Sequence, residues 1–244
     1  MSNGSILRRI GSASVAGAAA VAVLAPSASA LAPTAAPRAT AETLVGKLTV
    51  KQYVDYLKAQ KGPAAKATLK AFRALPKAKQ QKFVGHLQNR AIYQAFTASL
   101  KGTTRFPVQR VKVPYNADVT FVREIRVAKT KGIVGTDTRI AFTMTEQIFG
   151  ISVTSEQVWV KYRTRPHGWG ASKLLGGGAS VSNVNAAVRI AGDGVRTQLV
   201  RGSAHVETTW KATPRIDSFG KGLNKKQYLY AGVNGTWASG LHNV

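Results

Sequence analysis

The sequence predicts an α+β protein in which a small N-terminal helical region precedes an antiparallel all-β sandwich or barrel. Apolar residues recur at helical spacing within residues 41–103, and this spacing disappears afterwards. Residues 104–244 are rich in Val, Thr, Ile and Gly and alternate between apolar and polar. Tight-turn signals divide this part into about eight strands, with no helices between them to connect parallel neighbours.

The first 30 residues have the three parts of a secretory signal peptide. Arg8 and Arg9 precede an apolar run from Ile10 to Leu24, and Ala28-Ser29-Ala30 supplies the small-x-small cleavage pattern. We therefore expect a secreted, extracellular protein that could associate with the cell surface. The run is shorter than the ~20 residues of a membrane span, and no later stretch is more apolar. Residues 31–40 are rich in Pro, Ala and Thr and are expected to form a flexible linker.

The helical region, residues 41–103, is expected to contain about three helices. Thr49 and Gln52 form a capping box at the start of the first helix. Pro63 and Pro76 suit the first turns of the second and third helices. The apolar positions expected to be buried are Val50, Tyr53, Val54 and Leu57, then Ala65, Leu69 and Phe72, then Phe83, Val84, Leu87, Ala91 and Ala95. Most lysines lie off these faces, as on a solvated helical surface.

Two long strands are expected to meet near Phe149-Gly150, within the stretch from Thr136 to Trp169. Ile140, Phe142, Met144 and Ile148 alternate with polar residues, which is typical of a sheet with one dry face. The expected connections elsewhere are a polar loop at Lys129–Thr136, a mobile Gly-rich loop at Leu174–Asn185, and hairpin turns at Gly192–Gly194 and Asn234-Gly235.

The charge is strongly positive, with 35 Lys plus Arg against 10 Asp plus Glu and a net charge of +25. Removal of Arg8 and Arg9 with the leader would leave 33 basic and 10 acidic residues, a net charge of +23. Such an excess attracts nucleic acid, anionic envelope polymers or acidic lipid headgroups, or simply keeps the protein soluble. The absence of cysteine excludes disulfides, thiolate metal sites and cysteine nucleophiles.

The candidate binding residues are Trp159, Lys161, Arg163, Arg165 and Trp169. If residues 158–163 form a strand, its even-numbered side chains face the core, and Trp159, Lys161 and Arg163 line the outer face. An exposed indole beside cations suits an anionic ligand that contains rings. The plainer alternative places Trp159 in the core and leaves the cations solvated, because charges on a sheet surface also oppose aggregation.

No catalytic residue, metal site or cofactor is predicted. His205 and Glu207 share one face of an expected strand but lack a third ligand, so cross-strand pairing explains them more simply. The sequence contains no Gly-x-Ser-x-Gly elbow, and Gly176-Gly177-Gly178 is not followed by the Lys-Ser/Thr of a phosphate loop.

These features favour a non-catalytic binding protein for anionic polymers, either envelope polymers or nucleic acid, at or outside the cell envelope. A secreted hydrolase of an envelope polymer is the first alternative, with its acids brought together by the fold. The second is an inhibitor or toxin-like protein that presents the Gly-rich loop to a partner. Bilayer insertion of a hairpin from Thr136 to Ser155 is a less favoured interpretation, since soluble sheets show the same alternation. The oligomeric state is not predicted.

Overall fold

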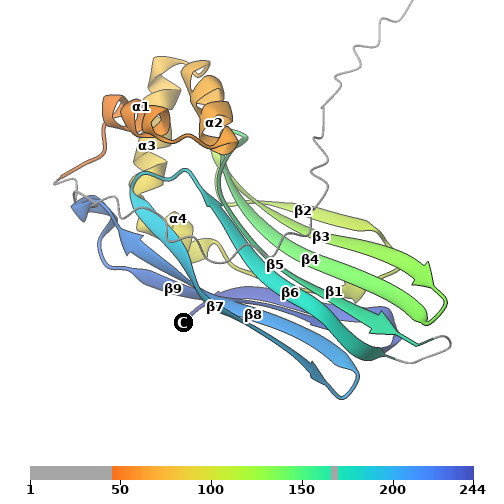
Figure 1. Cartoon of the computed structure of the whole chain (residues 1–244). Helices are drawn as coiled ribbons and strands as arrows, with labels where there is room; N and C mark the ends of the chain where they lie inside the picture. The colour runs from red at the N-terminus through yellow and green to blue at the C-terminus, as the bar shows by residue number, and fades with distance from the viewer. Residues whose placement is uncertain (1–45, 166–169) are drawn as a thin grey trace, which may run out of the picture. The chain divides into compact units, whose positions relative to one another are not determined.

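The computed structural model describes residues 46–165 and 170–244, and residues 41–244 form one compact unit (Figure 1). It contains helices followed by strands, which confirms the α+β class. The expected signal peptide, the linker and Trp169 lie outside the described residues.

Four α-helices occupy residues 50–95, one more than expected. They are α1 (Val50–Ala59), α2 (Pro63–Arg73), α3 (Lys77–Gln88) and α4 (Arg90–Ala95). The capping box of Thr49 and Gln52 is present. Asn89 ends α3 and caps α4 by accepting a hydrogen bond from the amide of Ala91, so the expected third helix is divided. No helix among the described residues is both long and apolar enough to cross a membrane.

The described strands form two five-stranded antiparallel sheets, so the β part is a sandwich. One sheet has the order β2-β3-β4-β5-β6, and the other has the order β1-β10-β9-β8-β7. The strands are β1 (Ala98–Thr103), β2 (Val108–Pro114), β3 (Val119–Gly132), β4 (Gly135–Ile148), β5 (Ile151–Thr164), β6 (Ala171–Asn183), β7 (Val188–Val200), β8 (Ser203–Pro214), β9 (Leu223–Ala231) and β10 (Thr236–Asn243), with 3₁₀ turns at Asp217–Phe219 and Val233–Gly235.

Two of the expected turns are confirmed. Phe149 and Gly150 join β4 to β5 with φ angles of 50° and 78°, which suits a two-residue hairpin. Asn234 and Gly235, with φ angles of 58° and 68°, lie in the four-residue connection from β9 to β10, residues 232–235. Both pairs supply the positive φ that matches the right-handed twist of the flanking strands.

Four other expectations were wrong. Strand β1 lies within the range expected to be helical and completes an edge of the second sheet beside β10. Lys129–Thr136 is not a loop, because β3 and β4 continue into it and leave only Ile133 and Val134 as the turn. The Leu174–Asn185 loop is mostly strand β6. Gly192–Gly194 is a bulge inside β7, and the chain turns later, at Arg201-Gly202.

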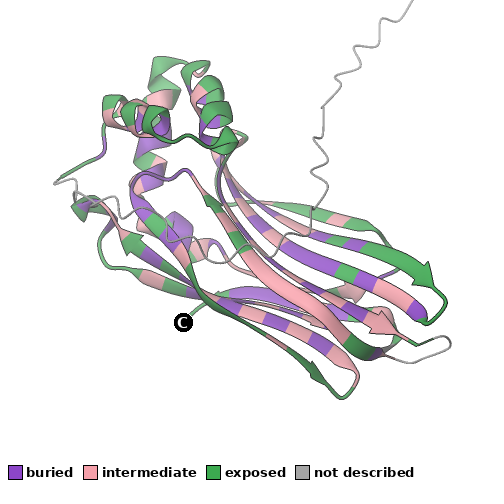
Figure 2. Cartoon of the chain, in the orientation of Figure 1, coloured by how far each residue is buried: buried purple, intermediate pink, exposed green. Residues whose placement is uncertain are grey.

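Inward-facing side chains of both sheets form the core together with the helices (Figure 2). Helices α1–α3 lie at one end of the sandwich, and the β3–β4 and β7–β8 turns lie at the other (Figure 1). Polar contacts attach the helical region to the sheets. Buried Asn185 donates to the carbonyl of Leu87 at 3.0 Å, and His86 contacts Asp118 at 3.0 Å.

Gln227 of β9 joins the two sheets through the core. Its side-chain oxygen accepts a hydrogen bond from the buried indole nitrogen of Trp210 at 2.8 Å. Its amide nitrogen donates to the backbone carbonyls of Phe142 and Glu156 in the opposite sheet, at 3.3 and 3.2 Å. A single buried amide thus satisfies groups on β4, β5 and β8, which fixes the relative position of the sheets.

Replacing Gln227 with Leu should lower the free energy of unfolding by about 3 kcal/mol, because the Trp210 indole and two carbonyls would lose a buried partner. Urea denaturation measures this change. Exposed Gln81 on α3 provides the control, since Gln81→Leu should alter stability by less than about 0.5 kcal/mol. Equal effects of the two substitutions would show that the Gln227 bridge contributes no specific stability.

Candidate functional site

Trp159 lies on the outer face of the sheet formed by β2–β6. Val158, Val160 and Tyr162 are buried, as the alternation along β5 requires, whereas Trp159 is half-buried. Its neighbours Lys161 and Arg163 share the outer face. Three of the five predicted residues therefore lie on one surface, and Arg165 is exposed just beyond the end of β5. Trp169 lies outside the described residues.

The three-glycine run of β6 accommodates Trp159. A Cβ atom at Gly178 would lie 2.7 Å from the indole nitrogen, and one at Gly176 would lie 3.7 Å from the ring. Gly177 points the other way, where a Cβ would come within 2.3 Å of the Thr197 side chain on β7. The run that resembles a flexible loop in sequence is thus a strand whose glycines allow close packing on both sides.

Arg139 of β4 stacks on the same indole. Its guanidinium carbon lies 4.7 Å from the ring centroid, within the range of a cation–π interaction. Part of the Trp159 ring is therefore already occupied by protein. The ring is held in position rather than projecting freely into solvent.

Asp137 connects the two cations next to Trp159. Arg163 donates to both carboxylate oxygens, at 2.6 and 3.1 Å, and the Lys161 ammonium lies 3.8 Å away. The hydrogen bond from Arg163 is the main cause of a lowered pKa at Asp137. This carboxylate holds the cations in place but leaves part of their charge uncompensated.

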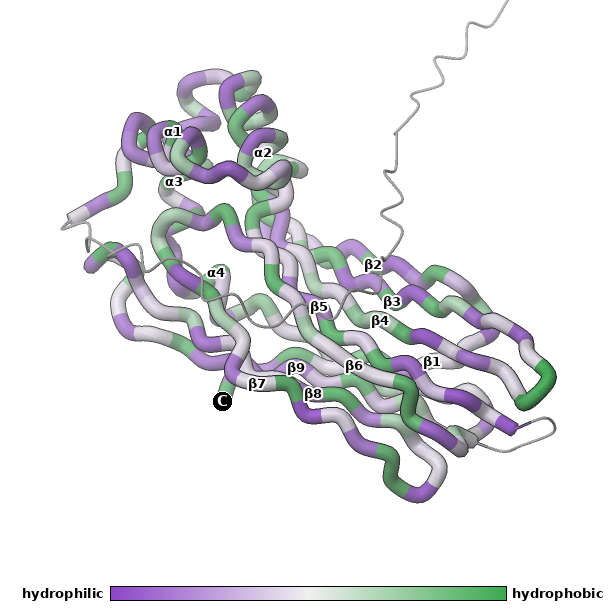
Figure 3. The backbone as a smooth tube through the Cα atoms, viewed as in Figure 1, coloured by the Kyte–Doolittle hydropathy of each residue, from purple (hydrophilic) through white to green (hydrophobic). Residues whose placement is uncertain are grey.

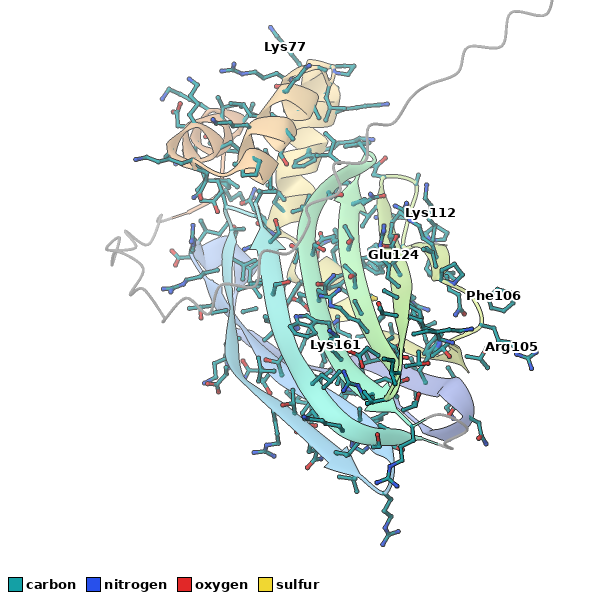
Figure 4. The ribbon with its side chains drawn as sticks, turned by 45° about the vertical axis from the view of Figure 1, so that its right-hand side comes forward. Lys77, Arg105, Phe106, Lys112, Glu124 and Lys161 are labelled. Carbon is teal, nitrogen blue, oxygen red and sulfur yellow. The ribbon has the colours of Figure 1, made fainter. Side chains whose placement is uncertain are left out.

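The strand register extends this surface across the whole sheet. Outward positions carry seven cations, which we call the basic face: Arg110, Lys112, Arg126, Arg139, Lys161, Arg163 and Lys173. The outward positions of the same strands include two acids, Glu124 and Asp137. Glu124 pairs with Arg110 and Arg126. Figure 4 shows Lys112, Glu124 and Lys161 on this sheet.

A neutral, hydroxyl-rich area adjoins the basic face toward the helices. Gln157 donates to the Thr143 hydroxyl at 2.8 Å, and the hydroxyls of Thr145 and Ser155 are 3.2 Å apart. Trp159 stands between this area and the cations along β5. Hydrogen-bonding groups and positive charges are therefore available on one continuous surface.

A second cluster, which sequence reasoning missed, lies buried where the helices meet the two sheets. Glu156 accepts a hydrogen bond from the Tyr93 hydroxyl of α4 at 2.8 Å, and Glu146 is paired with Thr154 across β4 and β5. Lys225 of β9 lies 4.9 Å from the centroid of the Tyr93 ring and donates to Asn243 at 2.6 Å. These residues are called the buried acid cluster below.

Burial dominates the electrostatics of the buried acid cluster. Glu146 and Glu156 have exposed fractions of 2% and 0%. Desolvation raises the pKa of both carboxyl groups, to about 7 at Glu146, and lowers the pKa of Lys225. The sequence did contain a signal, because Glu146 continues the apolar alternation of Phe142 and Met144 onto the inner face. Glu146 and Glu156 lie on separate strands, so only the fold could bring the two carboxyl groups together.

His205 and Glu207 lie on the outer face of β8. His205 packs against the Tyr230 ring, with centroids 4.4 Å apart, and Glu207 pairs with Lys226 at 2.9 Å. In the part of the chain that the structure describes, no three His, Cys, Asp or Glu side chains group as metal ligands would. The two residues have the cross-strand contacts of an ordinary polar face.

No model of a protein family, no curated protein and no solved structure matches this chain. The function is therefore argued from the residues themselves.

Replacing Gly178 with Ala should displace the Trp159 ring and destabilise the protein by about 1–3 kcal/mol, since the new Cβ would overlap the indole. The indole N–H resonance of Trp159 in a ¹⁵N NMR spectrum should move, and thermal unfolding should begin earlier. Gly85→Ala is the control, because nothing lies within 4 Å of a Cβ at that helical position. That substitution should be neutral or stabilise by up to about 1 kcal/mol. An unmoved Trp159 resonance in Gly178→Ala would contradict the packing described.

The raised pKa of Glu146 predicts a pH-dependent stability. Between its ordinary pKa of 4.5 and about 7, the folded protein holds a proton that the unfolded chain has released. The free energy of unfolding should therefore fall as pH rises through this range, by about 3 kcal/mol from this group. Glu146→Gln should remove that part of the decrease, which urea titrations at several pH values will measure.

Asp137→Asn is the surface control for that measurement. The hydrogen bond from Arg163 lowers the pKa of Asp137. The stability that this ionised carboxylate contributes is therefore lost as the pH falls, at a more acid pH than the range that reports on Glu146. Parallel stability curves for the parent protein and Glu146→Gln would show that Glu146 is not protonated by burial.

Proposed function

We propose that this chain is a secreted, non-catalytic binding protein for anionic polymers at or outside the cell envelope, and that the basic face is its binding surface. The observation that supports this most directly is the composition of that face. Seven cations stand against two acids, and both acids are already paired with neighbouring cations. Five positive charges thus remain in excess on one sheet surface, next to a fixed indole.

The spacing of the basic face suits a chain of repeated negative charges. Adjacent strands lie about 4.8 Å apart, and successive outward residues along a strand lie about 6.6 Å apart. Arg139 and Lys161 are directly paired across β4 and β5, and Arg163 follows Lys161 on the same face. A polymer with a charged group on each unit could contact several cations at once, each at a modest individual strength.

Two further features support a polymer rather than an isolated ion. The hydroxyl and amide groups of Thr143, Gln157 and Ser155 continue the surface beyond the charges, and Trp159 offers an aromatic edge between them. Stacking on an indole tolerates sugars and bases alike. An acidic glycan or a nucleic acid would use all three kinds of contact.

The hydrolase alternative has less support from the geometry. The two carboxyl groups with raised pKa, Glu146 and Glu156, are buried and cannot meet a polymer. Asp193 and Glu207 do line an open groove of about 400 Å³, but Lys211 and Lys226 contact them at 2.6 and 2.9 Å. Both carboxylates are thus bound by lysine side chains, whereas glycoside hydrolysis needs two carboxyl groups that can reach the sugar. The inhibitor hypothesis relied on a presented loop at Leu174–Asn185, most of which is strand β6.

Replacing Lys161, Arg163 and Arg165 together with Ala should weaken binding to heparin, to a teichoic-acid-type polymer or to DNA by at least about ten-fold at low salt. Binding by the parent protein should also weaken as salt rises, because counterions compete for the same cations. Affinity chromatography and fluorescence titration across a salt series measure both effects.

The matched control removes three exposed lysines from the helices: Lys66, Lys70 and Lys77. This triple variant loses the same net charge but leaves the basic face intact, so its affinity should stay within about two-fold of the parent. Absence of binding by the parent at low salt would refute the proposal. Equal losses in the two triple variants would refute the basic face as the binding surface.

A further inference from the structure

The turns at the end of the sandwich opposite α1–α3 lie next to one another. Thr136 beside the β3–β4 turn pairs with Thr164 at the end of β5. Thr164 in turn pairs with Ala171 of β6, whose amide donates to the carbonyl of Gly202 in the β7–β8 turn at 2.7 Å. Residues of three connections are therefore tied together at one end, which we call the turn end.

The turn end exposes apolar side chains where hairpins ordinarily have Asn, Asp or Gly. Ile133 and Val134 are the two residues of the β3–β4 turn, and they are 100% and 61% exposed. Leu199 and Val200 lead into the β7–β8 turn and are 38% and 41% exposed. Both hydrophobic tips are visible at the same end of the chain in Figure 3. Neither pair has a packing role in the described structure.

Cations surround these apolar tips. The exposed cations are Lys129, Lys131, Arg165, Lys173 and Arg201. No acid occurs among the described residues of these turns, which are 129–136, 164–165, 170–173 and 198–203. Arg105 and Phe106 project to solvent at the neighbouring β1–β2 connection (Figure 4). Apolar tips set among basic residues are typical of loops that bind a membrane surface, because the apolar side chains contact acyl chains while the cations contact anionic headgroups.

A cavity of about 420 Å³ opens between the sheets at the turn end. The inward positions of β3, β4 and β5 become more polar toward the turn end. The apolar set Val127, Ile140 and Val160 is followed, two residues further along each strand, by Lys129, Thr138 and Tyr162. Lys131, Thr136 and Thr164 form the next layer, and Arg105 stands at the rim. The volume lies within the roughly 300–1,000 Å³ of small-ligand sites, and the lining offers cations and hydroxyls for an oxyanion.

We propose that the turn end docks on an anionic lipid surface. Ile133, Val134 and Val200 enter the boundary between headgroups and acyl chains, while Lys129 and Lys131 at the mouth of the cavity bind a headgroup phosphate. This surface adjoins the basic face, which lies along the strands, and Lys173 belongs to both. Docking by the turn end leaves the outer face of β4–β6 open to a polymer.

Flotation of the purified protein with vesicles tests this proposal, using phosphatidylcholine alone and phosphatidylcholine mixed with phosphatidylglycerol. The parent protein should bind the mixed vesicles and bind pure phosphatidylcholine much more weakly. The double substitution Ile133→Asn with Val134→Gly should weaken binding by at least about ten-fold, since two apolar side chains no longer leave water. Ile133 and Val134 are both largely exposed, so this variant should fold about as well as the parent.

Two controls make the result specific. Val111→Asn replaces another exposed apolar residue, 48% exposed on β2, and should not change vesicle binding. Lys129→Gln with Lys131→Gln should weaken binding to mixed vesicles by about ten-fold. The Ile133→Asn, Val134→Gly variant should retain parental affinity for heparin, which separates this proposal from the polymer-binding one. Failure of the parent to bind mixed vesicles at low salt, or parental binding by the turn variant, would overturn the proposal.

Discussion

Burial of charged groups at the junction of the helices and the two sheets constrains the rest of this structure. Glu146 and Glu156 lose their hydration there, and a lone buried carboxylate is unfavourable by several kcal/mol. Glu156 accepts a hydrogen bond from Tyr93 of α4, and the nearby cation Lys225 of β9 favours the ionised form of both carboxyl groups. One oxygen of each carboxyl group has no hydrogen-bond partner among the described residues.

The same junction explains why helices and sheets form one unit. Gln227 and Trp210 continue the polar contacts across the sandwich, and Gln227 donates to carbonyls of β4 and β5. A buried polar network of this kind admits few alternative packings, because any shift leaves a donor or acceptor without a partner. The chain has no disulfide, so the network and the apolar core together determine how the sheets meet.

Charge is distributed unevenly over the described surface, and the sheets impose this pattern. Alternation along each strand sends every second residue outward, and the antiparallel register then aligns cations from β2 to β6. Trp159 is fixed among them by Arg139 and by the glycines of β6. The turn end differs, because apolar and basic residues occur together there and the inner face becomes polar. The surfaces proposed for polymer binding and for lipid docking therefore adjoin each other, with Lys173 belonging to both.

Local sequence determined the elements whose signals are local. The capping box at Thr49, the buried faces of α1–α3 and the turns at Phe149-Gly150 and Asn234-Gly235 depend on neighbouring residues, so they could be predicted. The expected face of α4 was wrong, because Ala91 is exposed and Ile92 and Tyr93 are buried. The outward position of Trp159 followed from a period of two. Only the tertiary structure showed that Gly176–Gly178 belongs to a strand. A run of glycines indicates a loop unless a distant side chain, here Trp159 or Thr197, occupies the space beside it. The tertiary structure also decided the burial of Glu146 and Glu156 near Tyr93 and Lys225, because α4 and β9 lie far from β4 and β5 in the sequence.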